Sequence, residues 1–159
     1  NALLKSGRPE EAMESYAESV RLRPGFADGY NNLGMAAASA GRWDEAMEHY
    51  RKAIEVDPYL HRAYNNLGAA LVREHRWEEA IQMFLKAVEI NSDYAEARNN
   101  LGNALAILGR FDEAAVQYEM ALKLNPDMEQ VRRNLAQAQE DARKQRAGGQ
   151  PGPAARQGE

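Results

Sequence analysis

A tandem repeat of constant length constrains the fold of this chain more than any other feature. The tripeptide Asn-Leu-Gly, each time preceded by another asparagine, begins at Asn32, Asn66 and Asn100. The same shift aligns alanine with alanine and aromatic residue with aromatic residue, at Ala12, Ala46, Ala80 and Ala114, and at Tyr16, Tyr50, Phe84 and Tyr118. A period of about 34 residues indicates a small structural unit that is repeated along the chain and buries its apolar face against its neighbours.

Each unit contains two segments with the apolar spacing of an amphipathic helix. In one second segment, apolar residues recur at helical spacing while charged residues fill the opposite face, the apolar ones being Ala46, Met47, Tyr50, Ala53 and Ile54. Gly41 and Gly109 are expected to end first helices in the left-handed conformation. Prolines follow several second segments, at Pro24, Pro58 and Pro126. The sequence therefore predicts an all-α chain of antiparallel helix pairs.

The unit resembles the tetratricopeptide repeat (TPR) family, whose pattern contains Leu-Gly, an alanine, an aromatic residue, a second alanine and a proline. The resemblance implies an α-α superhelix, a right-handed TPR solenoid. Its repeats are expected at 27–60, 61–94 and 95–128, after a partial repeat over 1–26 that lacks its opening turns and indicates a longer parent protein. Three residues depart from the pattern: Arg98, Ser92 and His75.

The last part of the chain departs from the repeat. Residues 129–146 continue the register with many polar side chains and one narrow apolar stripe, so we expect a C-terminal capping helix that docks on the preceding pair. Residues 147–159 are mostly glycine, proline, glutamine and alanine. Such a segment buries too little apolar surface to offset its chain entropy, which predicts a disordered tail.

Composition narrows the classes of function. The chain has 159 residues, of which 44% are hydrophobic and 28% charged, which is typical of a folded soluble domain. Its net charge of −4 lacks the basic excess that phosphate neutralisation needs, so no nucleic-acid partner is expected. No apolar stretch reaches the roughly 18 residues of a membrane span, so no membrane insertion is expected. No targeting segment is recognisable. Localisation therefore stays unknown, with a soluble, cytoplasmic protein as the expectation.

Catalytic and metal-binding patterns are absent from the sequence. The chain has no cysteine, and His49, His61 and His75 fall at three unrelated repeat positions. Acidic pairs at the starts of second helices are explained by the helix macrodipole without acid-base chemistry. We therefore predict that the chain is not an enzyme and holds neither a cofactor nor a metal ion.

The asparagines before Leu-Gly are the candidate binding residues, because asparagine is a mediocre helix former and must serve another purpose there. The family resemblance implies that this position faces the concave groove, which gives a row of Asn32, Asn66, Asn100 and Asn134. The row is similar to the asparagine ladder of the O-linked N-acetylglucosamine transferase superhelix. A carboxamide offers one acceptor and two donors, so such a row is suited to binding the backbone of an extended peptide.

Further groove positions follow from the same register. The peptide-binding set adds Asn31, Asn65, Asn99, Arg62, Arg73 and Asn103. The other residues at those groove positions are Asp28, Glu96, Met35, Ala69, Ser39 and Ile107. Two interpretations stay open: the asparagines bind a ligand or satisfy contacts between helices, and the two arginines pair with an acidic ligand or remain solvated.

The predicted function is a protein–protein interaction scaffold that binds an extended or helical protein segment in the concave TPR groove. One alternative is the substrate-recognition arm of a larger enzyme such as a glycosyltransferase, which the full-length sequence would reveal. Another is a self-assembling structural module that associates through the truncated N-terminal repeat, around Ala12, Tyr16 and Val20. Light scattering across concentrations would separate that alternative from the others.

Overall fold

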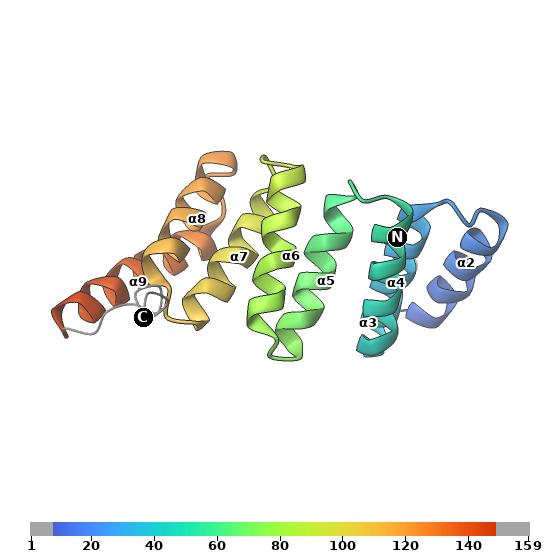
Figure 1. Ribbon diagram of the computed structural model, residues 1–159, viewed down its shortest axis with the longest axis horizontal. Helices are drawn as coiled ribbons and strands as arrows, with labels where there is room; N and C mark the ends of the chain where they lie inside the picture. Colours follow the sequence, from blue (N-terminus) through green and yellow to red (C-terminus); the bar gives the residue numbers. More distant parts are fainter. Residues whose placement is uncertain (1–7, 149–159) are drawn as a thin grey trace, which may run out of the picture. The chain divides into compact units, whose positions relative to one another are not determined.

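In the computed structural model, which describes residues 8–148, eight α-helices follow one another and no strand occurs in that range (Figure 1). The helices are α2 (Pro9–Leu22), α3 (Ala27–Ser39), α4 (Trp43–Val56), α5 (His61–Arg73), α6 (Trp77–Ile90), α7 (Ala95–Ile107), α8 (Phe111–Leu124) and α9 (Glu129–Ala147). This confirms the predicted all-helical repeat fold. The expectations for residues 1–7 and for most of the tail, 149–159, lie outside the described residues.

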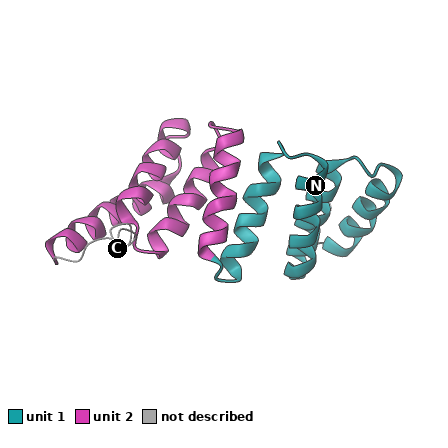
Figure 2. Cartoon of the chain, viewed as in Figure 1, with its two compact units in different colours: residues 1–76 teal, residues 77–159 magenta. Residues whose placement is uncertain are grey.

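The helices form two compact units, residues 1–76 and 77–159 (Figure 2). In unit 1, α2 packs on α3, α3 on α4 and α4 on α5, whereas in unit 2 α6 packs on α7, α7 on α8 and α8 on α9. Within each unit a further contact joins alternate helices, α3 with α5 and α7 with α9. We call the surface formed by α3 and α5, or by α7 and α9, the first-helix face of its unit.

Glycine on the first helices allows the second helices to approach closely. A Cβ atom on Gly34 would lie 2.6 Å from Cε1 of Tyr50, and one on Gly102 would lie 2.6 Å from Cε1 of Tyr118. Such contacts would force a shift, so a larger residue is excluded without repacking. These two glycines therefore pack directly against the aromatic ring of the following second helix. It holds α3 against α4 in unit 1 and α7 against α8 in unit 2.

The turns between paired helices use the left-handed backbone conformation. Gly41 has φ +77° and Gly109 has φ +72°, as the glycine pattern predicts. His75, which replaces the glycine of the equivalent turn, also has a positive φ of 57°. This conformation disfavours a residue with a Cβ atom, so His75 marks a locally costlier version of the same turn.

Two of the departures from the repeat pattern bind each other. Arg98 replaces the tyrosine of earlier repeats, and its guanidinium donates to the carbonyl oxygen of Ser92 at 2.8 and 3.0 Å. The capping helix has the same contact one repeat later, where Nη2 of Arg132 donates to the carbonyl oxygen of Pro126 at 2.7 Å. In unit 2, Arg98 of α7 and Arg132 of α9 thus each bind a backbone carbonyl of the loop that precedes their helix.

The capping helix α9 docks through small apolar residues. Val131, Ala138 and Ala142 are buried at 2%, 2% and 1% exposure, while most of the helix is exposed. Near its end, Nε2 of Gln145 donates to the carbonyl oxygen of Gly109 at 3.2 Å. These contacts fix α9 beside α7 and α8 and thereby shape the first-helix face of unit 2.

Candidate peptide-binding faces

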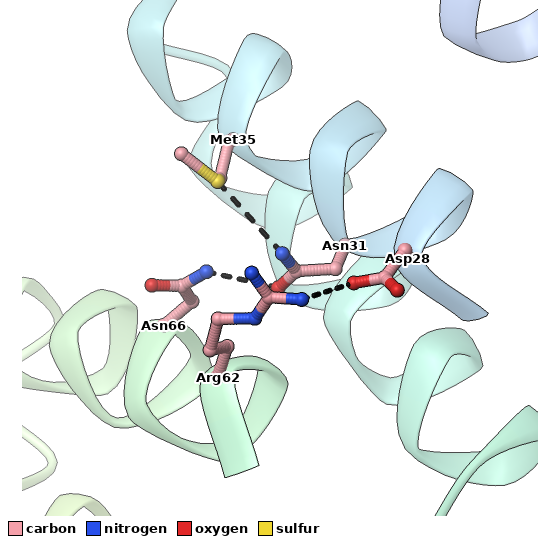
Figure 3. A network of polar contacts seen from close by, with 5 residues as sticks. All are labelled: Asp28, Asn31, Met35, Arg62 and Asn66. Atoms are coloured by element: carbon pink, nitrogen blue, oxygen red, sulfur yellow. Dashed lines mark hydrogen bonds and ion pairs between the residues drawn. The ribbon is translucent and has the colours of Figure 1, made fainter. Parts of the chain in front are cut away.

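An amide pair joins α3 and α5 on the first-helix face of unit 1 (Figure 3). Nδ2 of Asn66 donates to Oδ1 of Asn31 at 2.9 Å, and Nδ2 of Asn31 lies 3.8 Å from the sulfur of Met35. Asn31 is buried at 3% exposure, whereas Asn66 is partly exposed. We call the four asparagines of the predicted row, Asn32, Asn66, Asn100 and Asn134, the ladder residues. One of them, Asn66, is therefore held by a buried asparagine of the preceding first helix.

An ion pair lies beside this amide pair. Nη2 of Arg62 on α5 is 2.7 Å from Oδ1 of Asp28 on α3 (Figure 3). Arg62 is therefore paired within the unit. Both side chains are well exposed, at 55% and 43%, so the pair is worth at most about 1 kcal/mol. Either group can exchange its partner for a ligand at small cost.

Arg73, the other arginine predicted to bind a ligand, lies on an aromatic ring. Its guanidinium carbon is 4.7 Å from the centroid of the Trp43 ring, which brings the end of α5 onto the start of α4. An exposed cation–π contact of this kind contributes roughly 0.5–1 kcal/mol. The contact fixes the arginine in place without neutralising its charge.

Asn32 differs from Asn66, the residue at the same position of the next repeat. Asn32 is partly exposed on α3, and it makes no side-chain hydrogen bond with the residues between 8 and 148. Its carboxamide therefore keeps an acceptor and two donors for other partners.

Asn103 on α7 is the central residue of a side-chain hydrogen-bond network in unit 2. Its Oδ1 accepts from the hydroxyl of Tyr118 at 2.8 Å and from Nδ2 of Asn134 at 3.0 Å. Oδ1 of Asn134 in turn accepts from Nε2 of Gln130 at 2.8 Å. Because both acceptor sites of the Asn103 oxygen are occupied, its amide orientation is fixed, and its Nδ2 donors make no bond within the described residues.

Burial keeps the tyrosine of this network in its donor form. It raises the pKa of Tyr118 from its ordinary value of 10.0 to about 12, so the hydroxyl remains protonated at physiological pH. The amide orientation of Asn103 is therefore independent of pH over the range in which most proteins work.

A cavity of about 330 Å³ opens beside Asn103. Its walls come from α7, α8 and α9, and the lining residues are Asn103, Ala106, Ile107, Phe111, Tyr118, Asn134, Gln137, Ala138 and Asp141. The apolar members form most of its surface, and the amides and the one carboxylate supply the polar groups. We call it the α7–α9 pocket. It has the combination of apolar walls and a few placed polar groups that is typical of ligand sites.

Asn99 lacks the hydrogen bond that Asn31 receives, because Asn134 donates to Asn103 and not to Asn99. Its Oδ1 is buried without a hydrogen-bond partner among residues 8–148, and its Nδ2 reaches Oδ1 of Asn100 only at 3.5 Å. Asn65, at the same position in the preceding repeat, is buried at 1% exposure. The three asparagines that precede the ladder residues are thus mostly buried, unlike the ladder residues themselves.

Three polar residues of the α7–α9 pocket are absent from the predicted binding set. Tyr118 is expected to be a core residue, yet its hydroxyl orients Asn103. Gln137 and Asp141 are expected to solvate the capping helix, yet they line the pocket. The repeat register does contain a signal for the last two, because they lie one full repeat after Asn103 and Ile107.

Metal-type clusters and membrane-spanning helices are not found within residues 8–148. No group of three or more His, Cys, Asp or Glu side chains there is arranged to hold a metal ion. None of the described helices is long and apolar enough to cross a membrane.

Several solved structures align with most of this chain. Two crystal structures of MamA proteins align with TM-scores of 0.78 at 24% and 23% identity, covering 87% and 89% of this chain and 81% and 77% of those chains. The first TPR of Spaghetti (RPAP3), solved bound to the HSP90 peptide SRMEEVD, aligns at 27% identity with a TM-score of 0.70. That match covers 72% of this chain and 90% of the other. The Arabidopsis OM64 TPR domain aligns at 25% identity with a TM-score of 0.69, covering 72% and 94%.

Sequence comparison gives the family. Among curated protein sequences no relative matches significantly. Three family models of the tetratricopeptide repeat match residues 1–26, 27–60 and 59–127. Together they account for most of the sequence and agree with the helix pairs of both units. The chain therefore belongs to the tetratricopeptide repeat family.

Proposed function

We propose that the chain is a protein-interaction scaffold that binds an extended or helical segment of another protein on its first-helix faces. The family supports a scaffold role, because the tetratricopeptide fold is typically a non-catalytic interaction module. The structurally similar RPAP3 domain, which is bound to a peptide, supports a protein ligand. The specific partner is outside this proposal.

The observation that carries the proposal is the state of Asn103. Its oxygen is held by two donors, and its Nδ2 group is left with two free hydrogens at an open pocket of about 330 Å³. A peptide carbonyl is a suitable acceptor for such a donor, and the side chain next to that carbonyl fits the scale of the pocket. The first-helix face of unit 1 offers a second open carboxamide at Asn32.

The buried asparagines have a supporting role in this proposal. Asn31 orients the ladder residue Asn66 by accepting its Nδ2, and is itself too buried to contact a ligand without rearrangement. Preorganisation of this kind lowers the entropy that binding must offset, because the ladder amide is already held in one rotamer. Arg73 adds a positive charge on the same helix, α5, whereas the charge of Arg62 is paired with Asp28.

The proposal is tested by locating the bound peptide. Peptides that bind the full chain are selected from a random-sequence library, and one is titrated into isotope-labelled protein while side-chain amide signals are followed by NMR. We expect the largest shifts at the Nδ2 groups of Asn32 and Asn103 and at the methyl groups of Ile107. A shift pattern confined to the second helices, for example around Leu85 and Val116, which line a separate cavity of about 200 Å³, would refute the proposal.

A further inference from the structure

The charge of the α7–α9 pocket identifies the kind of side chain that it accepts. Asp141 is the one charged residue among those that line it. Its Oδ2 accepts a hydrogen bond from Nε2 of Gln137 at 3.0 Å. Within residues 8–148 it forms no ion pair, and Lys144, one turn further along α9, is 2.6 Å from Glu140 instead. The pocket therefore contains a carboxylate without an ion-pair partner among the described residues.

The other residues that line the pocket are in large part apolar. Ile107 is 55% exposed, and it lines the pocket together with Ala106, Phe111 and Ala138. A lysine or arginine side chain suits both features, because its methylene stem covers apolar surface while its charged head remains at a polar group. The Phe111 ring adds a surface on which a cation is favoured.

The carboxylate is specific to this unit of the chain. The residues at the same repeat position are Ser39, Arg73 and Ile107, so the helix register itself does not require an acid there. On α5 of unit 1 this position is Arg73, whose guanidinium lies over the Trp43 ring. The charge at this position is therefore a property of the α7–α9 pocket and not of the repeat.

We propose that the α7–α9 pocket binds a lysine or arginine side chain of the partner segment, with its charged head at Asp141 and its stem on Ile107 and Phe111. The proposal rests on the proposed function and names the residue that this site selects. A purely apolar side chain would desolvate the carboxylate without pairing it, and an acidic one would be repelled by it. Asn103 lines the same pocket, so its Nδ2 group can donate to the backbone carbonyl of the same segment.

A charge exchange tests the inference. The probe is a positional-scanning library of synthetic dodecapeptides, applied to the full chain and to the Asp141→Asn and Asp141→Lys variants. We expect the full chain to enrich lysine and arginine at one position. Asp141→Asn should lower this enrichment about fivefold, the scale of a partly exposed ion pair, and Asp141→Lys should replace it with aspartate and glutamate. Glu129→Gln is the matched control, because Glu129 is another exposed carboxylate of α9, pairs with Arg132 and does not line the pocket.

The outcomes separate the inference from the function on which it rests. If peptides bind and Asn103→Ala weakens them, but basic residues are not enriched or their enrichment survives Asp141→Asn, the inference is wrong and the scaffold function stands. Enrichment of apolar residues in place of basic ones would likewise refute the inference and leave the scaffold function standing. If no peptide pool binds, or if bound peptides are indifferent to Asn103→Ala and shift only second-helix signals, the proposed function fails and the inference fails with it.

Discussion

The two first-helix faces contain the same Asn-Asn sequence, yet their asparagines pair differently. In unit 1 the ladder residue Asn66 donates to the buried Asn31, 35 positions earlier. In unit 2 the ladder residue Asn134 donates instead to Asn103, 31 positions earlier. The residue four positions after the buried asparagine explains the difference, because it is Met35 in one unit and Asn103 in the other. A thioether is a weak acceptor and a carboxamide is a strong one.

This difference leaves a polar atom without a partner in unit 2. When Asn134 turns to Asn103, Oδ1 of Asn99 remains buried without a hydrogen bond from any described residue. Unpaired buried polar atoms are uncommon in native proteins, and conflicts of this kind concentrate at functional sites. The comparison indicates that in unit 1 both ends of the buried amide Asn31 have a partner, whereas in unit 2 the oxygen of Asn99 loses its partner and the amide beside the pocket is fixed.

The largest expected effect concerns the cores, where the two units should not differ. Leu33 and Leu101 follow the second asparagine in their units and are exposed by only 5% and 1%. Replacing either by alanine should lower the free energy of unfolding by about 2–5 kcal/mol, because each change leaves a cavity among buried side chains. Chemical denaturation measures both. A loss below about 0.5 kcal/mol in either variant, which is the usual scale of a surface substitution, would show that the packing of that unit is misassigned.

A smaller effect should separate the units. Asn31→Ala removes the acceptor of Asn66, so it should lower the free energy of unfolding by about 1–3 kcal/mol. Asn99→Ala removes an acceptor that has no partner among the described residues, so its cost should be smaller. Chemical denaturation compares the two variants. As a control, Asn31→Ala is also measured in a Met35→Asn background. In that background Asn66 gains a second acceptor, and Asn31→Ala should cost less. Equal losses in the two single variants would contradict the paired and unpaired assignment.

The sequence is sufficient to predict the helix pairs because their cause is periodic. The spacing of Gly34 from Tyr50 is the same as that of Gly102 from Tyr118, and each repeat imposes the same close approach. The left-handed turn at Gly41 follows from the same logic, since only glycine adopts it without cost. Agreement among local preferences, period and packing is the condition under which a fold can be inferred from one sequence.

The partners of the polar side chains could not be predicted in this way. The register predicts that Asn66 and Asn134 occupy the same repeat position. The acceptor of each, Asn31 or Asn103, depends on side-chain rotamers in the preceding repeat. The pairing of Arg62 with Asp28 has the same origin, because two exposed groups at one repeat position meet only when adjacent first helices are placed. The polarity of the capping helix predicts that Gln137 and Asp141 are solvated, whereas the repeat register places them one repeat after Asn103 and Ile107.

Open first-helix amides should bind the backbone of a partner segment, and Asn32 tests this central claim most directly. The Asn32 side chain makes no hydrogen bond within residues 8–148, so Asn32→Ala should leave the melting temperature nearly unchanged. Calorimetric titration with a library-selected peptide should show affinity weakened by about 1–3 kcal/mol, or about 5- to 150-fold. Asn66→Ala should weaken binding similarly, with some added loss of stability. Unchanged affinity per folded molecule in Asn32→Ala, together with a loss of stability, would contradict the claim and assign the asparagines to contacts between helices.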